Sequence, residues 1–107
     1  MNDVAYVEAA RVFAERAMKE GGTTPRERIA YAFRVATARR PKETEIEILL
    51  DGFARNLESF KAKTDAAVKY VSHGEHPRDG RLDVSELAAY TSVTSLILNL
   101  NETVMKE

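Results

Sequence analysis

The sequence contains no cysteine among its 107 residues, so disulfides, thiolate-bound metals and a covalently attached haem are excluded. It also lacks an excess of charge of either sign, because 16 lysines and arginines balance 17 carboxylates to a formal net charge of -1. A nucleic-acid binder would show a strongly basic face. No apolar run approaches the roughly 20 residues of a membrane span. We therefore expect no nucleic-acid partner and no membrane span.

The residues that usually perform catalysis are scarce. The chain has no cysteine nucleophile, no serine in a known spacing with a histidine, and no glycine-rich phosphate-binding loop. Carboxylates are numerous, but helical spacing predicts that they lie on solvated faces rather than as an acid–base pair in a cleft. The start, Met1 to Val4, lacks the basic and apolar segments of a signal peptide. We predict no catalytic residue and no cofactor site within this chain.

The sequence does have clear helical periodicity and enough apolar residues, 44%, for one core. No strand-like alternation competes with it. The expected helices span about 3–20, 25–39, 43–63, 65–72 and 84–106. The predicted fold is a single all-α domain, 1–107: a small antiparallel helical bundle of about four main helices plus one short helix.

Local signals mark where these helices begin and end. Gly21-Gly22 ends the first helix, because glycine adopts the left-handed C-cap conformation without strain. Thr24 can cap the second helix, with Pro25 at its first position and Glu27 closing a capping box. Pro41 predicts that this helix ends near residue 38 or 39.

The last helix is expected to be the central one. It carries no charge from Leu87 to Asn101, and a helix that is apolar over more than half its circumference is usually surrounded by others. Thr94 and Asn101 interrupt this surface. They could be polar groups satisfied within the core, which we favour, or part of a contact with another domain.

Two features of the other helices need tertiary explanations. The charged side of the first helix carries Glu8, Arg11, Glu15 and Lys19, three or four residues apart, and we expect it to face solvent. In the third helix, Gly52 costs about 1 kcal/mol relative to alanine. Either another helix approaches closely there or the glycine is simply tolerated.

The segment 75–86 partly resembles a calcium-binding loop. Glu75, Asp79, Asp83 and Glu86 fall at ligand positions of an EF-hand, but Pro77 stands where a side-chain oxygen is needed. A simpler interpretation is that Asp79-Gly80 forms a turn while Asp83 and Glu86 cap the last helix. Calcium binding by these four residues is an alternative hypothesis.

Two further polar clusters have simple interpretations as well. His73 and His76 are too few to complete a zinc site, and we expect them to be solvated. The end of the second helix is basic and the start of the third is acidic, which complements the helix dipoles. A phosphate or nucleic-acid site there is a secondary hypothesis. The residues of this charged region are Arg26, Arg28, Arg34, Arg39, Arg40, Lys42, Glu43, Glu45, Glu47 and Asp51.

Three separated segments carry a family resemblance. They are Asn2–Arg11; Arg28–Arg34 with Arg39-Arg40-Pro41; and Glu86–Thr91 with Leu98–Glu102. In this order they resemble the C-terminal end of a planctomycete-specific domain of unknown function, found in large proteins that often carry a cytochrome c-like segment. The sequence departs from that pattern at Tyr90, where tryptophan is expected, and at Asn101, where aspartate is expected. The family's loop before the last helix commonly lacks an Asp-Gly pair, which weakens the calcium hypothesis.

The resemblance implies a fragment of a larger, exported multidomain protein, with an extracytoplasmic location and with other domains of that protein as partners. The family offers no catalytic residues to transfer. The leading functional hypothesis is a non-catalytic helical module, structural or interaction-mediating. The alternatives are the cation-binding module at 75–86 and an accessory wall of an active site formed by upstream domains.

Overall fold

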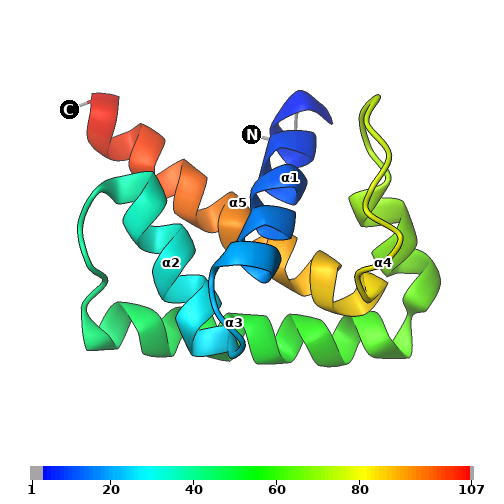
Figure 1. The fold of residues 1–107 in the computed structure, drawn as a ribbon, viewed down its shortest axis with the longest axis horizontal. Coiled ribbons are helices and arrows are strands. Elements are labelled where there is room, and N and C mark those ends of the chain that lie inside the picture. The colour runs from blue at the N-terminus through cyan, green and yellow to red at the C-terminus, as the bar shows by residue number, and fades with distance from the viewer. Residues whose placement is uncertain (1–3, 107) are drawn as a thin grey trace.

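The protein is described by a computed structural model that covers residues 4–106. Within this range the chain forms five helices and no strand: α1 (Val4–Glu20), α2 (Pro25–Thr37), α3 (Glu43–Ala62), α4 (Thr64–Val71) and α5 (Val84–Lys106) (Figure 1). The predicted all-α bundle with one short helix is confirmed. None of the described helices combines the length and apolarity needed to cross a membrane.

The predicted capping signals operate at the start of α2. The Thr24 hydroxyl oxygen accepts a hydrogen bond from the Glu27 amide at 3.2 Å, and the Glu27 carboxylate accepts one from the Thr24 amide at 3.1 Å. Gly22, with φ of 105°, makes the left-handed turn that precedes this cap. Two short connections join α1, α2 and α3, and α2 contacts both α1 and α3.

The second helix ends earlier than its predicted limit of residue 39. Its last helical residue is Thr37, and Ala38 adopts a left-handed conformation with φ of 61°. The Ala38 amide donates to the Arg34 carbonyl, which closes the final turn. An alanine in this conformation is strained by roughly 1–2 kcal/mol. The sequence offers no glycine at this C-cap.

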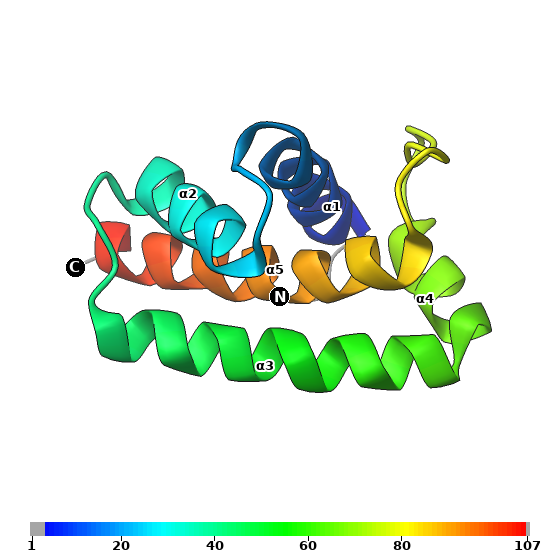
Figure 2. The same cartoon turned by 60° about the horizontal axis from the view of Figure 1, so that its bottom comes forward.

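The last helix is central, as predicted. It contacts each of the other four helices, and it runs antiparallel to α3 while α1 crosses it (Figure 2). Its inward side chains Leu87, Tyr90, Val93 and Ile97 are buried. Phe53 of α3 packs on Tyr90 with ring centroids 4.4 Å apart. The core therefore forms around α5.

The polar group at Thr94 is satisfied inside this core. Its hydroxyl is buried and donates to the Ala10 carbonyl of α1 at 2.8 Å, with the Thr91 carbonyl 3.1 Å away. This confirms the favoured interpretation for Thr94. The side chain of Asn101 lies outside the described residues. At Gly52 no atom lies within 4 Å of the position that a β-carbon would take, so no neighbouring helix requires the glycine.

Candidate functional site

The charged side of α1 is not free, contrary to the prediction that it faces solvent. Arg11 is only 2% exposed, because the connection between α4 and α5 lies across it. Its guanidinium donates to the His76 carbonyl at 2.5 Å, to the Pro77 carbonyl at 3.4 Å and to Glu15 at 3.1 Å. Arg11 therefore anchors a distant segment to α1. Its Nε is buried and makes no hydrogen bond within the described structure.

The carboxylates that flank Arg11 complete this anchor. Glu8 accepts a hydrogen bond from the His76 amide at 2.8 Å, and Glu15 accepts one from the Asp79 amide at 2.9 Å. Lys19 forms an ion pair with Asp79 at 2.7 Å. We call this set, Glu8, Arg11, Glu15 and Lys19 with the segment 73–83, the α1 clasp. Its polar groups are directed at the chain itself rather than at a ligand.

The four candidate calcium ligands occupy different surroundings. Asp79 is held by Arg81 at 2.9 Å as well as by Lys19, and these two cations depress the pKa of its carboxyl. Asp83 accepts the Glu86 amide at 2.9 Å and so caps α5. Glu75 is exposed. The described residues include no group of three or more histidines and carboxylates arranged to hold a metal ion. The structure thus does not gather Glu75, Asp79, Asp83 and Glu86 into one site.

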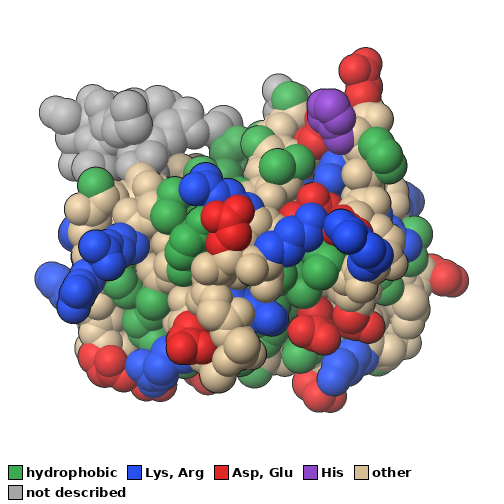
Figure 3. Space-filling model, in the orientation of Figure 1, with side chains coloured by type: hydrophobic (Ala, Val, Ile, Leu, Met, Phe, Trp, Pro, Cys, Tyr) green, Lys and Arg blue, Asp and Glu red, His purple; other side chains and the backbone are tan. Residues whose placement is uncertain are grey.

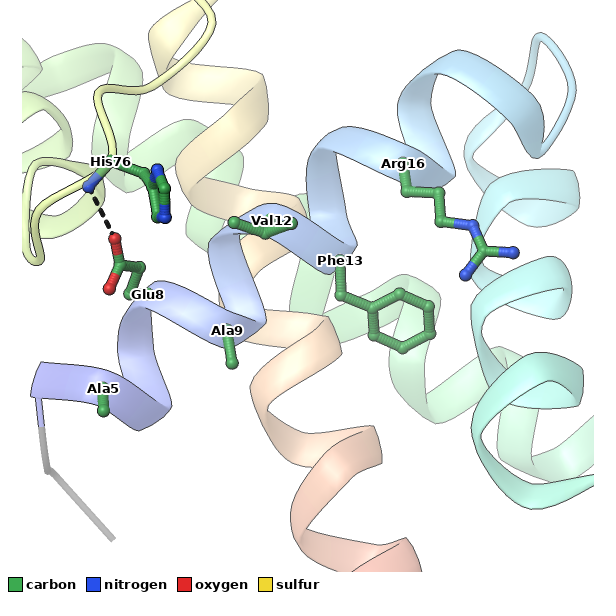
Figure 4. A pocket seen from close by; sticks show the side chains of 7 residues that line it. All are labelled: Ala5, Glu8, Ala9, Val12, Phe13, Arg16 and His76. Atoms are coloured by element: carbon green, nitrogen blue, oxygen red, sulfur yellow. Dashed lines mark hydrogen bonds between the residues drawn. The ribbon is translucent and has the colours of Figure 1, made fainter.

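A shallow hollow of about 430 Å³ runs along α1 beside the clasp (Figure 4). Its lining includes the small side chains Ala5 and Ala9 and the half-exposed Val12, together with Phe13 and Arg16. Glu8 also lines it, and its carboxylate accepts a hydrogen bond from the backbone amide of His76. The one carboxylate and the one histidine that border it are thus not positioned as a free acid–base pair. The hollow offers an apolar surface with little polar chemistry.

A second and larger hollow lies between α2 and the start of α3, with a volume of about 850 Å³; we call it the α2–α3 groove. Its apolar surface comes from Ala30, Tyr31, Val35, Pro41 and Ile46. Val35, in the last turn of α2, is 45% exposed and contributes accessible apolar surface to the groove. Ala38, in its left-handed conformation, ends α2, and Pro41 lines the groove before α3 begins.

Charged side chains border the same groove: Arg26, Glu27, Arg34, Arg40 and Glu43. Figure 3 shows basic side chains at the left edge of the molecule, over the α2–α3 connection, beside exposed hydrophobic surface. Arg26 is neutralised, because it pairs with both Glu43 and Glu47 at 2.8 Å. Among the side chains that the structure describes, those of residues 5–100, neither Arg34 nor Arg40 has a carboxylate within ion-pair distance.

The neighbouring Arg39, unlike Arg34 and Arg40, is fully paired with a carboxylate. Both terminal nitrogens of Arg39 donate to the Glu45 carboxylate at 2.9 Å, and its guanidinium lies 4.8 Å from the centre of the Phe33 ring. The Arg39 hydrogen bonds, followed by the Lys42 amide, lower the pKa of Glu45 to about 2. Of the arginines in this charged region, Arg26 and Arg39 thus pair directly with glutamates of α3, a tertiary contact that the expected complementarity with the helix dipoles did not specify.

The clasp was not predicted from the sequence, and the basic region at the groove was noted only as a secondary phosphate or nucleic-acid site, without its apolar surface. Arg11 carries no local signal of burial, because its partners lie 65 residues away. The unpaired state of Arg34 and Arg40 depends on which of several arginines reaches the few glutamates opposite. Only the half-exposed Val35, out of step with the apolar stripe of α2, is a feature that the sequence could have supplied.

Comparisons with protein-family models, with curated proteins and with solved structures find no match to this chain.

Proposed function

We propose that this chain is a non-catalytic helical interaction module that docks a partner segment in the α2–α3 groove, and that the segment belongs to another domain of a larger protein. The observation that carries the proposal is the groove itself. It combines apolar side chains, among them the half-exposed Val35, with two arginines that have no carboxylate partner in the described part of the chain. Arginine and large apolar side chains are enriched at protein interfaces, and the groove offers both kinds of residue.

The titratable groups support a binding role over a catalytic one. The carboxylates whose pKa is shifted, Glu27, Glu45 and Asp79, all have a lowered pKa, caused by hydrogen bonds and neighbouring cations. A general acid at neutral pH needs the opposite shift. The shifted carboxylates therefore serve as caps and ion pairs. The resemblance to a domain of large multidomain proteins supports a partner within the same polypeptide.

The proposal is tested by selecting peptides from a random displayed library against the protein. Val35→Asp places a charge on the groove floor, and Val12→Asp makes the same change on α1 at almost equal exposure, 46% against 45%. Both positions are solvent-accessible, so both variants should fold, which circular dichroism verifies.

We expect enriched peptides to bind the native protein and Val12→Asp alike and to bind Val35→Asp about tenfold more weakly or worse, a loss of about 1.4 kcal/mol. Selection of no binding peptide, or of peptides that are insensitive to Val35→Asp, would reject the groove as a docking site.

A further inference from the structure

We infer that the segment docked in the α2–α3 groove is acidic: a peptide whose carboxylates pair with Arg34 and Arg40 on either side of apolar residues that cover Val35 and Pro41. This inference rests on the proposed function and names the chemistry of its partner.

Four arginines within a short stretch of chain differ in whether a glutamate is bound to them. Arg26 and Arg39 each make two short bonds to glutamates of α3, at 2.8 and 2.9 Å respectively. Arg34 and Arg40 line the groove without a carboxylate partner in the described part of the chain. The carboxylates of the α3 start are thus already used. Among the described residues, no other carboxylate is paired with Arg34 or Arg40, so both remain available to an anion from a partner.

Guanidinium groups favour carboxylates as partners, because two parallel N–H groups match the two carboxylate oxygens. Such a pair gains strength when apolar contact removes water around it. The groove supplies that contact through Val35, Pro41 and Ile46. An acidic segment with apolar residues between its carboxylates fits this arrangement of charge and apolar surface.

The acidic residues of the groove distinguish this occupant from a continuous polyanion. Glu27 and Glu43 line the same hollow as the two arginines. Hydrogen bonds from Thr23 and Thr24 keep Glu27 in its charged form by lowering its pKa. A nucleic-acid strand or polyphosphate would bring phosphates against these carboxylates, at an energetic cost. A peptide can place its carboxylates only where the arginines are.

The size of the groove agrees with a short segment. Its volume of about 850 Å³ lies within the range of about 300–1,000 Å³ that is typical of binding pockets. It is a surface groove rather than an enclosed cavity, so a chain can enter and leave at its ends. A stretch of a few residues is therefore the expected occupant.

The test uses the whole chain and defined ligands. The first peptide carries two glutamates separated by leucines, the second replaces both glutamates by glutamine, and inorganic polyphosphate is the third ligand. Binding is followed by amide chemical shifts of labelled protein and by calorimetry. Arg34→Gln/Arg40→Gln removes the two unpaired cations. Arg55→Gln/Lys61→Gln removes two cations from exposed positions on α3 and is the matched control.

We expect the glutamate peptide to shift the amides around Val35 and Ile46. Its affinity should fall about tenfold with the glutamine peptide and about tenfold with Arg34→Gln/Arg40→Gln, and change less than about twofold with the control. Raising the salt concentration should weaken the native complex and have little effect on the residual binding of the double variant.

The other outcomes separate the two proposals. If the glutamine peptide binds the groove as tightly as the glutamate peptide, the acidic partner is wrong while the docking function remains. If polyphosphate binds more tightly than either peptide and displaces it, the partner is a polyanion and the inference is overturned. If no ligand shifts the groove amides and library selection also fails, both proposals are wrong.

Discussion

The α1 clasp and the α2–α3 groove are two cation-rich regions of the same small bundle, and they use arginine in opposite ways. In the clasp, Arg11 is buried and all its terminal nitrogens are directed at the chain's own carbonyls and carboxylates. In the groove, Arg34 and Arg40 are exposed and have no carboxylate partner among the described side chains of residues 5–100. The difference shows that charge density alone does not mark a binding surface.

What distinguishes the two regions is whether the chain itself satisfies the cation. Burying a charge is tolerated only where partners surround it, and the segment 73–83 supplies those partners to Arg11. An exposed arginine can remain solvated at little cost and is available to another molecule. We therefore assign the clasp to stability and the groove to binding. Substitutions in the two regions should separate these properties.

The largest effect is expected from Arg11→Leu. It leaves the carboxylates of Glu8 and Glu15 and the carbonyl of His76 without their cation, so the free energy of unfolding should fall by about 3 kcal/mol or more. Urea denaturation measures this fall, and hydrogen exchange should show lost protection in residues 73–83. Arg34→Leu is the control and should change stability by less than about 0.5 kcal/mol. Equal stability of the two variants would remove the distinction between the regions.

Gly74→Ala should weaken the clasp without removing any charge. Gly74 has φ of 95°, and a β-carbon there would overlap the carboxyl group of Glu8. We expect a loss of about 2 kcal/mol in the free energy of unfolding, from backbone strain together with displacement of the segment 73–83. Gly80→Ala in the same segment meets no atom within 4 Å and should be nearly neutral. A neutral Gly74→Ala would mean that the segment does not rest on Glu8 as described.

Acid should destabilise both regions. The pKa of Asp79 in the clasp is depressed by Arg81 and Lys19, and the pKa of Glu45 beside the groove is lowered from 4.5 to about 2 by Arg39. A carboxyl whose folded pKa lies below its unfolded pKa contributes stability above the unfolded value and loses it as pH falls through the folded value. For Glu45 the free energy of unfolding should therefore decline from about pH 4.5 to about pH 2.

Denaturation measured across this pH range tests the contribution of each carboxyl. Glu45→Gln should flatten the decline and leave hydrogen exchange of residues 73–83 unchanged, whereas Asp79→Asn should flatten it and raise exchange in that segment. An unchanged slope in both variants would show that these pairs are not maintained in solution.

The smallest expected effect is an increase in stability. Ala38 ends α2 in a left-handed conformation beside the groove, so Ala38→Gly should relieve strain and raise the free energy of unfolding by about 0.5 kcal/mol after the entropy of glycine in the unfolded chain is subtracted. Ala36→Gly, inside the same helix, should instead lower it by about 1 kcal/mol. Thermal unfolding of both variants measures whether each substitution raises or lowers the free energy of unfolding. A loss at Ala38 equal to that at Ala36 would contradict the left-handed C-cap.

The sequence predicted the fold well because its helix signals are local. The capping box at Thr24 and Glu27 and the glycine pair after α1 all lie within a few residues of the structure that they specify. The central position of α5 also follows from one property of its own segment, the absence of charge from Leu87 to Asn101. Helical periodicity and capping residues were therefore enough to predict the helices, their approximate limits and the location of the core.

The candidate site could not be predicted in the same way. Periodicity correctly put Arg11 on the polar side of α1, but it could not indicate that residues 73–83 fold back over that side. Likewise the run of arginines after α2 gave no means to tell the neutralised Arg39 from the unpaired Arg40, since the outcome depends on the direction in which the chain leaves Ala38. The spacing of charged residues along the sequence therefore does not predict which of them pair across the folded structure.

We assign stability to the α1 clasp and partner binding to the α2–α3 groove. A charge exchange across the proposed interface tests this assignment most directly. Arg34→Glu/Arg40→Glu is titrated calorimetrically with the glutamate peptide and with a peptide that carries lysine in place of each glutamate. We predict that the lysine peptide binds the variant within about threefold of the native affinity for the glutamate peptide, and that the glutamate peptide loses binding to the variant. Equal binding of the glutamate peptide to the native and exchanged proteins would contradict the account.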